Sequence, residues 1–302
     1  MKLNEGDGYK TTGHLLASLT ILVWGTTYIS TKVLLRGFEP TEILMMRFLI
    51  GFVVLFVMSP HLLKPQGFKT ELTFALCGLS GITIYYLLEN IALTMTQASH
   101  VGVIICTAPF FTVILLRIIG KNEAPLRLTF FIGFLLAMAG ITLISVNGEE
   151  GAVTLRGDLL SLLAAVAWAV YSILMRNLSR RSYSIVQCTR RCFFYAILFM
   201  IPAMCFLPFH PDLTLLGRPA FLINMLFLGI VASGVCFVTW NESVRRLGAV
   251  TTSIYIYLTP VVTVLTARII LDEKLTAMKW VGVALTLIGL ILSERGKGGA
   301  GA

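Results

Sequence analysis

Ten blocks of apolar residues, each about as long as a membrane-spanning helix, dominate this 302-residue chain. A helix needs about 20 mostly apolar residues to cross the hydrocarbon core of a bilayer. Charged residues make up only 13% of the chain, whereas a soluble domain carries roughly 25%. The pattern predicts an all-α integral membrane protein with helices at approximately 14–35, 41–59, 71–95, 98–119, 128–146, 157–177, 185–207, 219–243, 249–270 and 277–293.

The loops between these blocks differ in their basic residues. When alternate loops are compared, those on the side of the N-terminus carry about twice as many Lys and Arg residues as the others. Because basic loops tend to stay in the cytoplasm, we expect both termini to be cytoplasmic. The first apolar block is longer than the core of a signal peptide, so we expect it to be retained.

Composition argues against several other classes of protein. The net charge of +9 is spread over the loops, and no basic run exceeds two residues, so we expect no nucleic-acid partner. The six cysteines all lie in apolar blocks, and the four histidines form no cluster with them, which predicts no metal site. No phosphate-binding loop or nucleophile triad is recognisable, so we expect neither a cofactor nor an enzyme.

The two halves of the chain resemble each other. The segment that begins at Ala98 matches the segment that begins at Ala249, including Pro109 with Pro260 and Arg117 with Arg268. Further pairs in the same order are Gly13/Gly157, Trp24/Trp168, Arg47/Arg190, Gly78/Gly229, Asn90/Asn241, Gly133/Gly282 and Gly140/Gly289. We therefore predict two repeats, residues 1–150 with helices 1–5 and residues 151–302 with helices 6–10 and a short flexible tail.

Five helices per repeat make the two repeats enter the membrane from opposite sides. Such inverted repeats are typical of secondary transporters, because the halves can exchange conformations around one central site. The alternative is a duplicated helical scaffold that serves a membrane enzyme or a lipid scramblase.

Local motifs add a family resemblance that covers nearly the whole chain. The second half carries Arg-Leu-Gly-Ala from Arg246, Leu-Thr-Pro from Leu258, and Glu-Lys-Leu from Glu273. The first half carries Trp24-Gly25, Arg47-Phe48 and Ala108-Pro109. In these motifs the chain resembles EamA-type members of the drug/metabolite transporter superfamily. Only a weaker copy of the Glu-x-Leu motif, at Glu123, follows the fourth helix.

The resemblance implies ten helices, a central cavity lined mainly by helices 1, 3, 4, 6, 8 and 9, and export of small metabolites such as amino acids. It also implies location in a bacterial cytoplasmic (inner) membrane.

Ionisable residues inside the predicted helices are candidates for function. Glu89 is the first candidate for binding a substrate amine or for coupling to protons; the alternative is a carboxylate held by a neighbouring helix. For the intramembrane basic residues Arg47 and Arg190, a role in orienting or pairing helices is the favoured interpretation, since the side chain of an arginine is long enough to reach the membrane interface. If the substrate were anionic, Arg47 would become a candidate ligand.

Two symmetry-related prolines, Pro109 and Pro260, lie within predicted helices. Each removes a backbone hydrogen bond, which predicts a hinge or a discontinuous helix beside a cavity, with a static kink as the alternative. Thr107 and Thr259 lie close enough to bind the freed carbonyls or a substrate. With the aromatic and amide residues of the same helices, the predicted substrate cavity comprises Trp24, Tyr28, Tyr86, Glu89, Asn90, Thr107, Trp168, Tyr171, Trp240, Asn241 and Tyr257.

Taken together, these features predict a secondary transporter, an exporter of a small neutral or zwitterionic, amino acid-like metabolite by alternating access. Besides the membrane enzyme or scramblase, the alternative is an importer of sugar-phosphate or nucleotide-sugar substrates, which would require several basic residues in the cavity. The expected partners are a small-molecule substrate and membrane lipid. Proton coupling, and whether the protein is a monomer or a homodimer, stay open.

Overall fold

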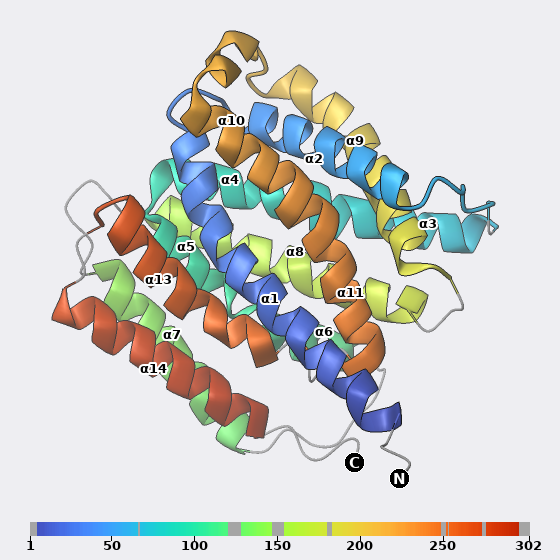
Figure 1. Cartoon of the computed structure of the whole chain (residues 1–302). Helices are drawn as coiled ribbons and strands as arrows, with labels where there is room; N and C mark the ends of the chain where they lie inside the picture. The colour runs from blue at the N-terminus through green and yellow to red at the C-terminus, as the bar shows by residue number, and fades with distance from the viewer. Residues whose placement is uncertain are drawn as a thin grey trace.

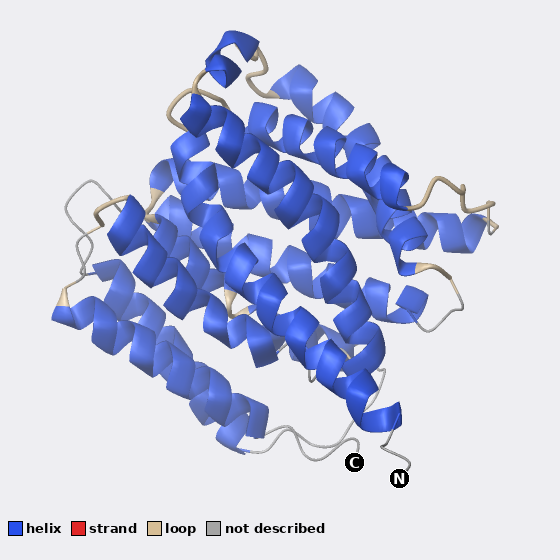
Figure 2. Cartoon of the chain, in the orientation of Figure 1, coloured by secondary structure: helices blue, strands red, loops and turns tan. Residues whose placement is uncertain are grey.

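The computed structural model describes residues 5–65, 67–119, 128–146, 154–179, 183–248, 252, 254–273 and 276–295. Within these residues all regular structure is helical (Figure 2). The predicted all-α fold is therefore confirmed. The boundary predicted between residues 150 and 151 and the tail after Arg295 lie outside the described residues, as does Glu123.

The first half contains five membrane-spanning segments, of which the third and fourth are interrupted. They are α1 (Glu5–Leu34), α2 (Pro40–Met58), the third span α3 (Phe68–Cys77), η1 (Gly78–Ile84) and α4 (Tyr85–Met95), the fourth span α5 (Ala98–Ile105) and α6 (Ala108–Ile118), and α7 (Leu128–Val146).

The second half repeats this order. Its segments are α8 (Leu155–Ser179), α9 (Ile185–Phe206), the short η2 (Leu213–Gly217), the eighth span α10 (Pro219–Leu226), η3 (Phe227–Val235) and α11 (Cys236–Leu247), the ninth span η4 (Ile254–Leu258) and α13 (Thr259–Ile270), and α14 (Ala277–Arg295).

The lengths of these segments suit a bilayer. Six are long and apolar enough to cross a membrane, and three shorter apolar helices lie at Leu128–Leu143, Tyr255–Ile270 and Ala277–Gly289. With α1 they make up the ten predicted spans. α1 begins at Glu5 rather than near residue 14 because its polar first turns pack on α11, where Arg246 lies 4.6 Å over the ring of Tyr9.

The third and eighth spans each contain a π-helical segment that the sequence did not predict. The segment η1 begins at Gly78 and η3 lies around Gly229, the residue that the repeat pairs with Gly78. A π-helix is rare and widens the backbone locally, and it is frequently found at functional sites. Tyr85 and Tyr86 directly follow η1, and Phe237 follows η3, so both segments orient aromatic rings toward the centre of the molecule.

The packing of the helices follows the repeat. α1 contacts α11 and α13. Its counterpart α8 makes the equivalent contacts with α4 and α6, which are the counterparts of α11 and α13. α2 packs on its counterpart α9, α7 packs on its counterpart α14, and α5 of the fourth span packs on α13 of the ninth. α7 and α14 lie side by side at one edge of the bundle (Figure 1). The predicted arrangement of two inverted five-helix repeats is confirmed.

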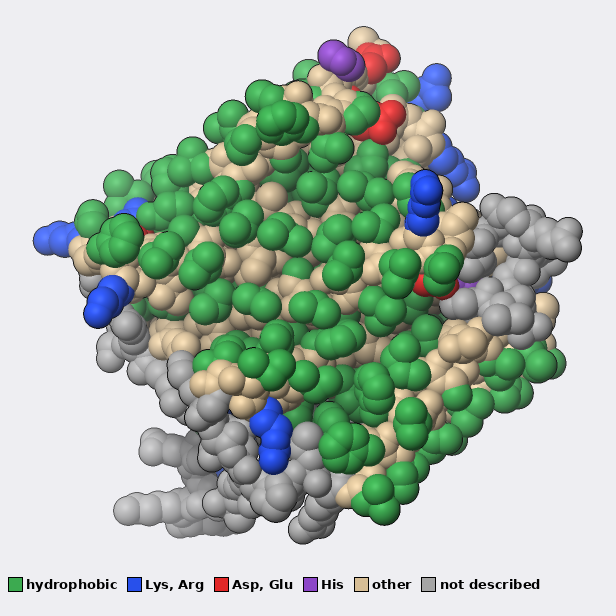
Figure 3. Space-filling model, turned by 180° about the vertical axis from the view of Figure 1, so that it is seen from behind, with side chains coloured by type: hydrophobic (Ala, Val, Ile, Leu, Met, Phe, Trp, Pro, Cys, Tyr) green, Lys and Arg blue, Asp and Glu red, His purple; other side chains and the backbone are tan. Residues whose placement is uncertain are grey.

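The outer surface of the bundle is apolar over the membrane-spanning part. Large exposed hydrophobic side chains occur on α1, α2, α7, α8, α9 and α14. Figure 3 shows a broad field of hydrophobic side chains, with Lys and Arg side chains toward its margins. An apolar belt of this kind needs lipid around it, so the chain is a multi-pass membrane protein.

Glycines bring α7 and α14 into close contact. A Cβ atom at Gly140 would lie 2.5 Å from Thr286 Oγ1 and 2.6 Å from the carbonyl oxygen of Gly282. Small residues allow helix backbones to approach in lipid, where packing replaces the hydrophobic effect as the attractive force.

We expect Gly140→Ala to lower the thermal stability of the detergent-purified protein. The added methyl group meets backbone atoms that cannot rotate away, and overpacking of this kind costs about 1–3 kcal/mol. Gly217→Ala is the matched control, because nothing lies within 4 Å of the position of its Cβ atom. Equal melting temperatures for the two variants would show that α7 and α14 can separate without cost.

Candidate functional site

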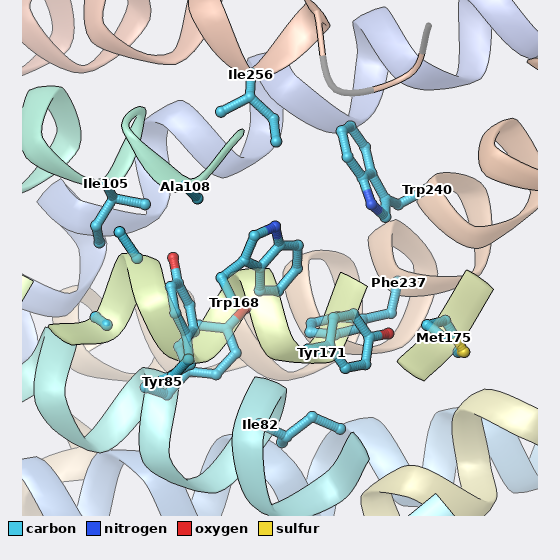
Figure 4. Packing of buried hydrophobic residues seen from close by; sticks show 14 of the residues in the cluster. Ile82, Tyr85, Ile105, Ala108, Trp168, Tyr171, Met175, Phe237, Trp240 and Ile256 are labelled. Carbon is cyan, nitrogen blue, oxygen red and sulfur yellow. The ribbon is translucent and has the colours of Figure 1, made fainter. Parts of the chain in front are cut away.

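Aromatic side chains from both halves meet at the centre of the bundle. Trp24 on α1 and Trp168 on α8, which the repeat pairs with each other, pack edge to face with ring centroids 5.5 Å apart. Tyr86 and Phe237, a second pair of counterparts, have ring centroids 6.2 Å apart. In Figure 4, Trp168 lies between Tyr85 on one side and Tyr171 and Phe237 on the other. The axis that relates the halves therefore passes through this cluster.

A small cavity lies beside these rings and has a volume of about 40 Å³. It is lined by residues from the first, third, fourth, sixth and ninth spans: Ile21, Trp24, Thr27, Tyr28, Tyr85, Tyr86, Glu89, Ile105, Cys106, Ala108, Trp168, Ile256 and Thr259. A water molecule needs roughly 10–15 Å³ on this measure. The cavity therefore has room for a few waters, and a metabolite requires it to widen.

Glu89 supplies the carboxylate of this cavity. Its side chain is 1% exposed, and its Oε1 atom has no hydrogen-bond partner among the described residues. Tyr85 and Tyr86 lie one turn before it on the same helix. The carboxylate interacts with the Tyr85 side chain and with the positive charge of Arg47. Its unpaired oxygen is still costly in an apolar interior, so this position favours a ligand that can donate a hydrogen bond to it.

Arg47 lies behind Tyr86 and does not line the cavity. Its guanidinium carbon is 4.2 Å from the centroid of the Tyr86 ring, and its Nε donates a hydrogen bond of 3.0 Å to Ser233 Oγ in η3. The side chain is fully buried, so it does not reach the interface in this conformation. Its position fixes the cavity-facing ring of Tyr86 and ties α2 to the π-helical segment of the second half.

Arg190, the counterpart of Arg47, has a different environment. It donates hydrogen bonds to the carbonyl oxygens of Ser59 and His61, at 2.6 Å for His61, where α2 has ended. These contacts attach the end of α2 to α9, at a distance from the cavity. In this structure Arg190 therefore pairs two helices, a role that the sequence suggested for the intramembrane arginines.

The two amides also lie outside the cavity and join neighbouring spans. Asn90 donates a hydrogen bond of 3.3 Å to the carbonyl oxygen of Pro40 at the start of α2. Asn241 donates one of 3.0 Å to Thr189 Oγ1 on α9. Since each amide binds the second helix of one half, these counterparts have equivalent packing positions.

Both prolines lie where a span is interrupted. Pro109 is in the first turn of α6 after the break at Cys106 and Thr107, and Pro260 is in the first turn of α13 after η4. Thr107 Oγ1 donates a hydrogen bond of 2.7 Å to the Ile104 carbonyl oxygen, so it satisfies the backbone at the break. The residues at the two breaks, Cys106, Ala108 and Thr259, line the cavity.

The structure gathers only part of the predicted set around the cavity. Trp24, Tyr28, Tyr86, Glu89 and Trp168 line it. Tyr171, Trp240 and Tyr257 are buried outside its lining; the ring of Trp240 packs 5.3 Å from Trp24.

Several lining residues carried no individual signal in the sequence: Ile21, Thr27, Ile105, Cys106 and Ile256. Their positions follow from helical spacing relative to Trp24 and from the turns before the two prolines. Helical spacing can therefore identify these residues only when the positions of the breaks in the helices are known.

The turn between α4 and α5 is held by charged side chains from three other segments. Glu273, which follows α13, accepts hydrogen bonds from the Ala98 backbone N–H at 3.0 Å and from Ser99 Oγ at 2.6 Å. Lys32 of α1 donates to the carbonyl oxygens of Leu93 and Thr96 at 2.5 and 2.7 Å. Lys279 of α14 donates to Gln97 Oε1 at 2.6 Å. We call this end of the bundle the α4–α5 end.

Comparisons with known proteins agree with this architecture. The model of the EamA-like transporter family matches residues 11–146 and 155–295, one match for each half. A protein from Archaeoglobus fulgidus described as an uncharacterized transporter is 28% identical over 286 residues, which is 93% of this chain and 96% of that protein.

A probable terminal-alkyne amino-acid exporter from Streptantibioticus cattleyicolor is 26% identical, over 92% of this chain and 91% of that protein. A solved crystal structure has the same fold with a TM-score of 0.67 at 18% identity, over 93% of this chain and 96% of that one. Because the family model covers almost the whole chain, this protein belongs to the EamA-like transporter family and is a membrane transporter.

Proposed function

We propose that this transporter exports a small neutral or zwitterionic, amino acid-like metabolite by alternating access. The observation that carries the proposal is the carboxylate of Glu89, buried and incompletely hydrogen-bonded in an aromatic cavity between the two halves. A protonated amine would neutralise this carboxylate, and the rings of Trp24 and Trp168 would pack on the rest of a small molecule. The relative that is named as a probable amino-acid exporter supports the same substrate class.

The cavity chemistry disfavours the importer of sugar phosphates or nucleotide sugars. Such a substrate carries negative charge and would need several arginines or lysines around it. None of the residues that line the cavity is basic, and Arg47 lies behind Tyr86. The carboxylate of Glu89 would in addition repel a phosphate.

The transport cycle follows from the inverted repeat. A cavity of about 40 Å³ is far smaller than the roughly 300–1,000 Å³ of a typical ligand site, so this conformation is contracted around the site. Each half has an interrupted span beside the cavity, at Pro109 and at Pro260. We infer that these breaks are the hinges, and that bending at one or the other opens opposite ends of the site.

The proposal also includes the cellular setting. The excess of Lys and Arg in alternate loops supports an orientation with both termini in the cytoplasm of a bacterial cell, in its cytoplasmic membrane. Glu89 is the candidate for proton coupling from within the cavity, since a proton and a substrate amine would compete for the same carboxylate.

Transport is tested first by a thermal-shift screen of detergent-purified protein against amino acids, sugars, polyamines and nucleotide sugars. Any compound that stabilises the protein is then tested for counterflow in liposomes. We expect saturable counterflow of an amino-bearing compound. Stabilisation by nucleotide sugars alone would overturn the substrate class.

Glu89→Gln is expected to reduce the affinity for an amine-bearing substrate by roughly ten- to a hundredfold. A hydrogen bond to a charged group contributes about 1.5–3 kcal/mol, which corresponds to a loss of this size. Isothermal titration and counterflow with the substrate found above measure the effect. Asp272→Asn, which changes a surface carboxylate, is the control. Unchanged affinity and unchanged pH dependence of flux in Glu89→Gln would contradict the assignment.

Substrate binding is expected to change the tryptophan fluorescence of the protein. Trp24 and Trp168 line the cavity and Trp240 packs against Trp24, whereas Trp280 is 43% exposed on the outer surface. A saturable change in emission should therefore persist in Trp280→Phe, and a compound that gives no counterflow should cause none. A change that disappears in Trp280→Phe would place the bound compound at the lipid-facing surface.

A further inference from the structure

A pair of buried ionisable residues, His100 and Asp158, lies away from the cavity. His100, in the first turn of α5, is 0% exposed, and neither of its ring nitrogens has a hydrogen-bond partner among the residues that the structure describes. Its Nδ1 atom is 3.9 Å from Oδ1 of Asp158, in the first turn of α8. Asp158 is 7% exposed, and its Oδ1 atom likewise has no hydrogen-bond partner within the described part of the chain.

The spacing suits a pair that responds to a proton. At 3.9 Å, Nδ1 of the imidazole and Oδ1 of the carboxylate are too far apart for a hydrogen bond. An imidazolium at the same place would be attracted to the carboxylate, and a shift of about 1 Å would close a charge-assisted hydrogen bond. Buried ionisable groups in membrane proteins are costly, and their presence by itself favours a functional role.

The pair lies at a junction between the two halves. Thr154 Oγ1, just before α8, donates a hydrogen bond of 3.1 Å to the Met95 carbonyl oxygen. A Cβ atom at Gly157 would lie 3.0 Å from Thr96 Cβ, so the start of α8 packs closely on the turn between α4 and α5. Any motion that opens the α4–α5 end between α5 and α8 must therefore change the distance from His100 to Asp158.

The repeat places a related contact at the opposite end. The pairing of Gly13 with Gly157 aligns His14 with Asp158. His14 Nδ1 lies 2.6 Å from the hydroxyl of Tyr255 in η4, so a histidine also joins the first half to the second half there. Of these two contacts, the one with His100 pairs the imidazole with a carboxylate, which makes it the more sensitive to charge.

The charges around His100 come from each element packed against α5. α1 contributes Lys32, α4 contributes Glu89, α8 contributes Asp158 and the exposed Arg156, and α13 ends with Arg268, paired with Asp272. Glu273 and Lys279 hold the adjacent residues of the turn. The described residues of α7 include no ionisable side chain. Near the turn, Lys32 and Lys279 balance Glu273 and Asp158, so a proton on His100 is an additional charge beside Asp158.

We propose that His100 and Asp158 form a proton-binding site between the two halves, separate from the substrate cavity. A proton from solution adds to the lone pair of a ring nitrogen of His100, and the imidazolium pairs with Asp158 and draws α5 toward α8. Because the proton binds more tightly when this contact is closed, acidification shifts the population toward a closed α4–α5 end. This coupling acts through the position of the halves and does not depend on which substrate is carried.

Direct titration of His100 tests the proton site. The full-length protein in detergent carries four histidines, His14, His61, His100 and His210, whose ring signals can be assigned by NMR with single His→Gln variants. Asp158→Asn is expected to reduce the proton affinity of His100 by about tenfold or more, because it removes an opposite charge within 4–6 Å. Asp212→Asn, in an exposed loop, should leave it unchanged. Identical His100 titration in Asp158→Asn and the parent would overturn the site.

Accessibility of the α4–α5 end tests the coupling. Ala98, next to Ser99 and fully buried, is changed to Cys in a variant whose six natural cysteines are replaced. Its alkylation rate is measured between about pH 5 and 8, the range in which histidine changes charge, with His100 present and with His100→Gln. The ratio of the two rates cancels the ionisation of the thiol.

We expect the His100→Gln protein to react several-fold faster than its parent at acid pH and at a similar rate at alkaline pH. A ratio that does not change with pH would overturn the coupling, and His100→Asn provides a second variant if His100→Gln does not fold. Neither measurement uses a substrate. Failure of the counterflow experiment therefore leaves this site standing, and failure here leaves the proposed export untouched.

Discussion

Backbone hydrogen bonding within lipid is the constraint on which the rest of this structure depends. A polar backbone group in hydrocarbon must find a partner inside the protein, so irregular backbone is tolerated only where other segments surround it. The breaks and π-helical segments here meet this condition. Trp24 Nε1 donates a hydrogen bond of 3.1 Å to the Ala232 carbonyl oxygen in η3, and Thr107 satisfies the carbonyl before the break in the fourth span. The cavity lies among these irregular segments.

The inverted repeat explains why the same residues recur at the centre. A helix that packs on its own counterpart must lie on the axis between the halves, and residues on that axis meet their counterparts, as Trp24 meets Trp168. A site on the axis has similar surroundings toward both ends of the molecule. In the proposed transport cycle, its exposure to one side or the other would depend on small differences between two nearly equal packing arrangements.

Charged contacts link the two halves at both ends of the bundle. At the α4–α5 end, Glu273 and Lys279 from the second half hold the turn of the first. At the opposite end Arg191 binds both carboxylate oxygens of Glu71, at 2.9 and 3.1 Å, and Tyr195 donates to the same carboxylate at 2.7 Å. Both sets of contacts link the halves, so opening either end in the proposed cycle would break ionic interactions that water can replace.

The sequence by itself determined the helical class, the approximate spans and the inverted repeat. Apolar length and periodic composition control whether a segment enters lipid, and these properties are local. It also indicated Glu89, Trp24 and Trp168, because a buried carboxylate and paired tryptophans stand out from Leu, Ile and Val. The extent of α1 was predicted less well, because its polar first turns are stabilised by contact with α11 rather than by lipid.

Only the tertiary structure decided which side chains face the cavity and which join neighbouring helices. Asn90 and Asn241 were predicted to line the cavity, yet each binds an adjacent span. Arg47, for which orientation or helix pairing was the favoured interpretation, also binds a neighbouring span. The π-helical segments and the breaks rotate the residues that follow them, so helical spacing alone could not assign their faces. His100 and Asp158 are 58 positions apart and belong to different halves. Their proximity depends on how α8 packs on the turn between α4 and α5, which no local pattern encodes.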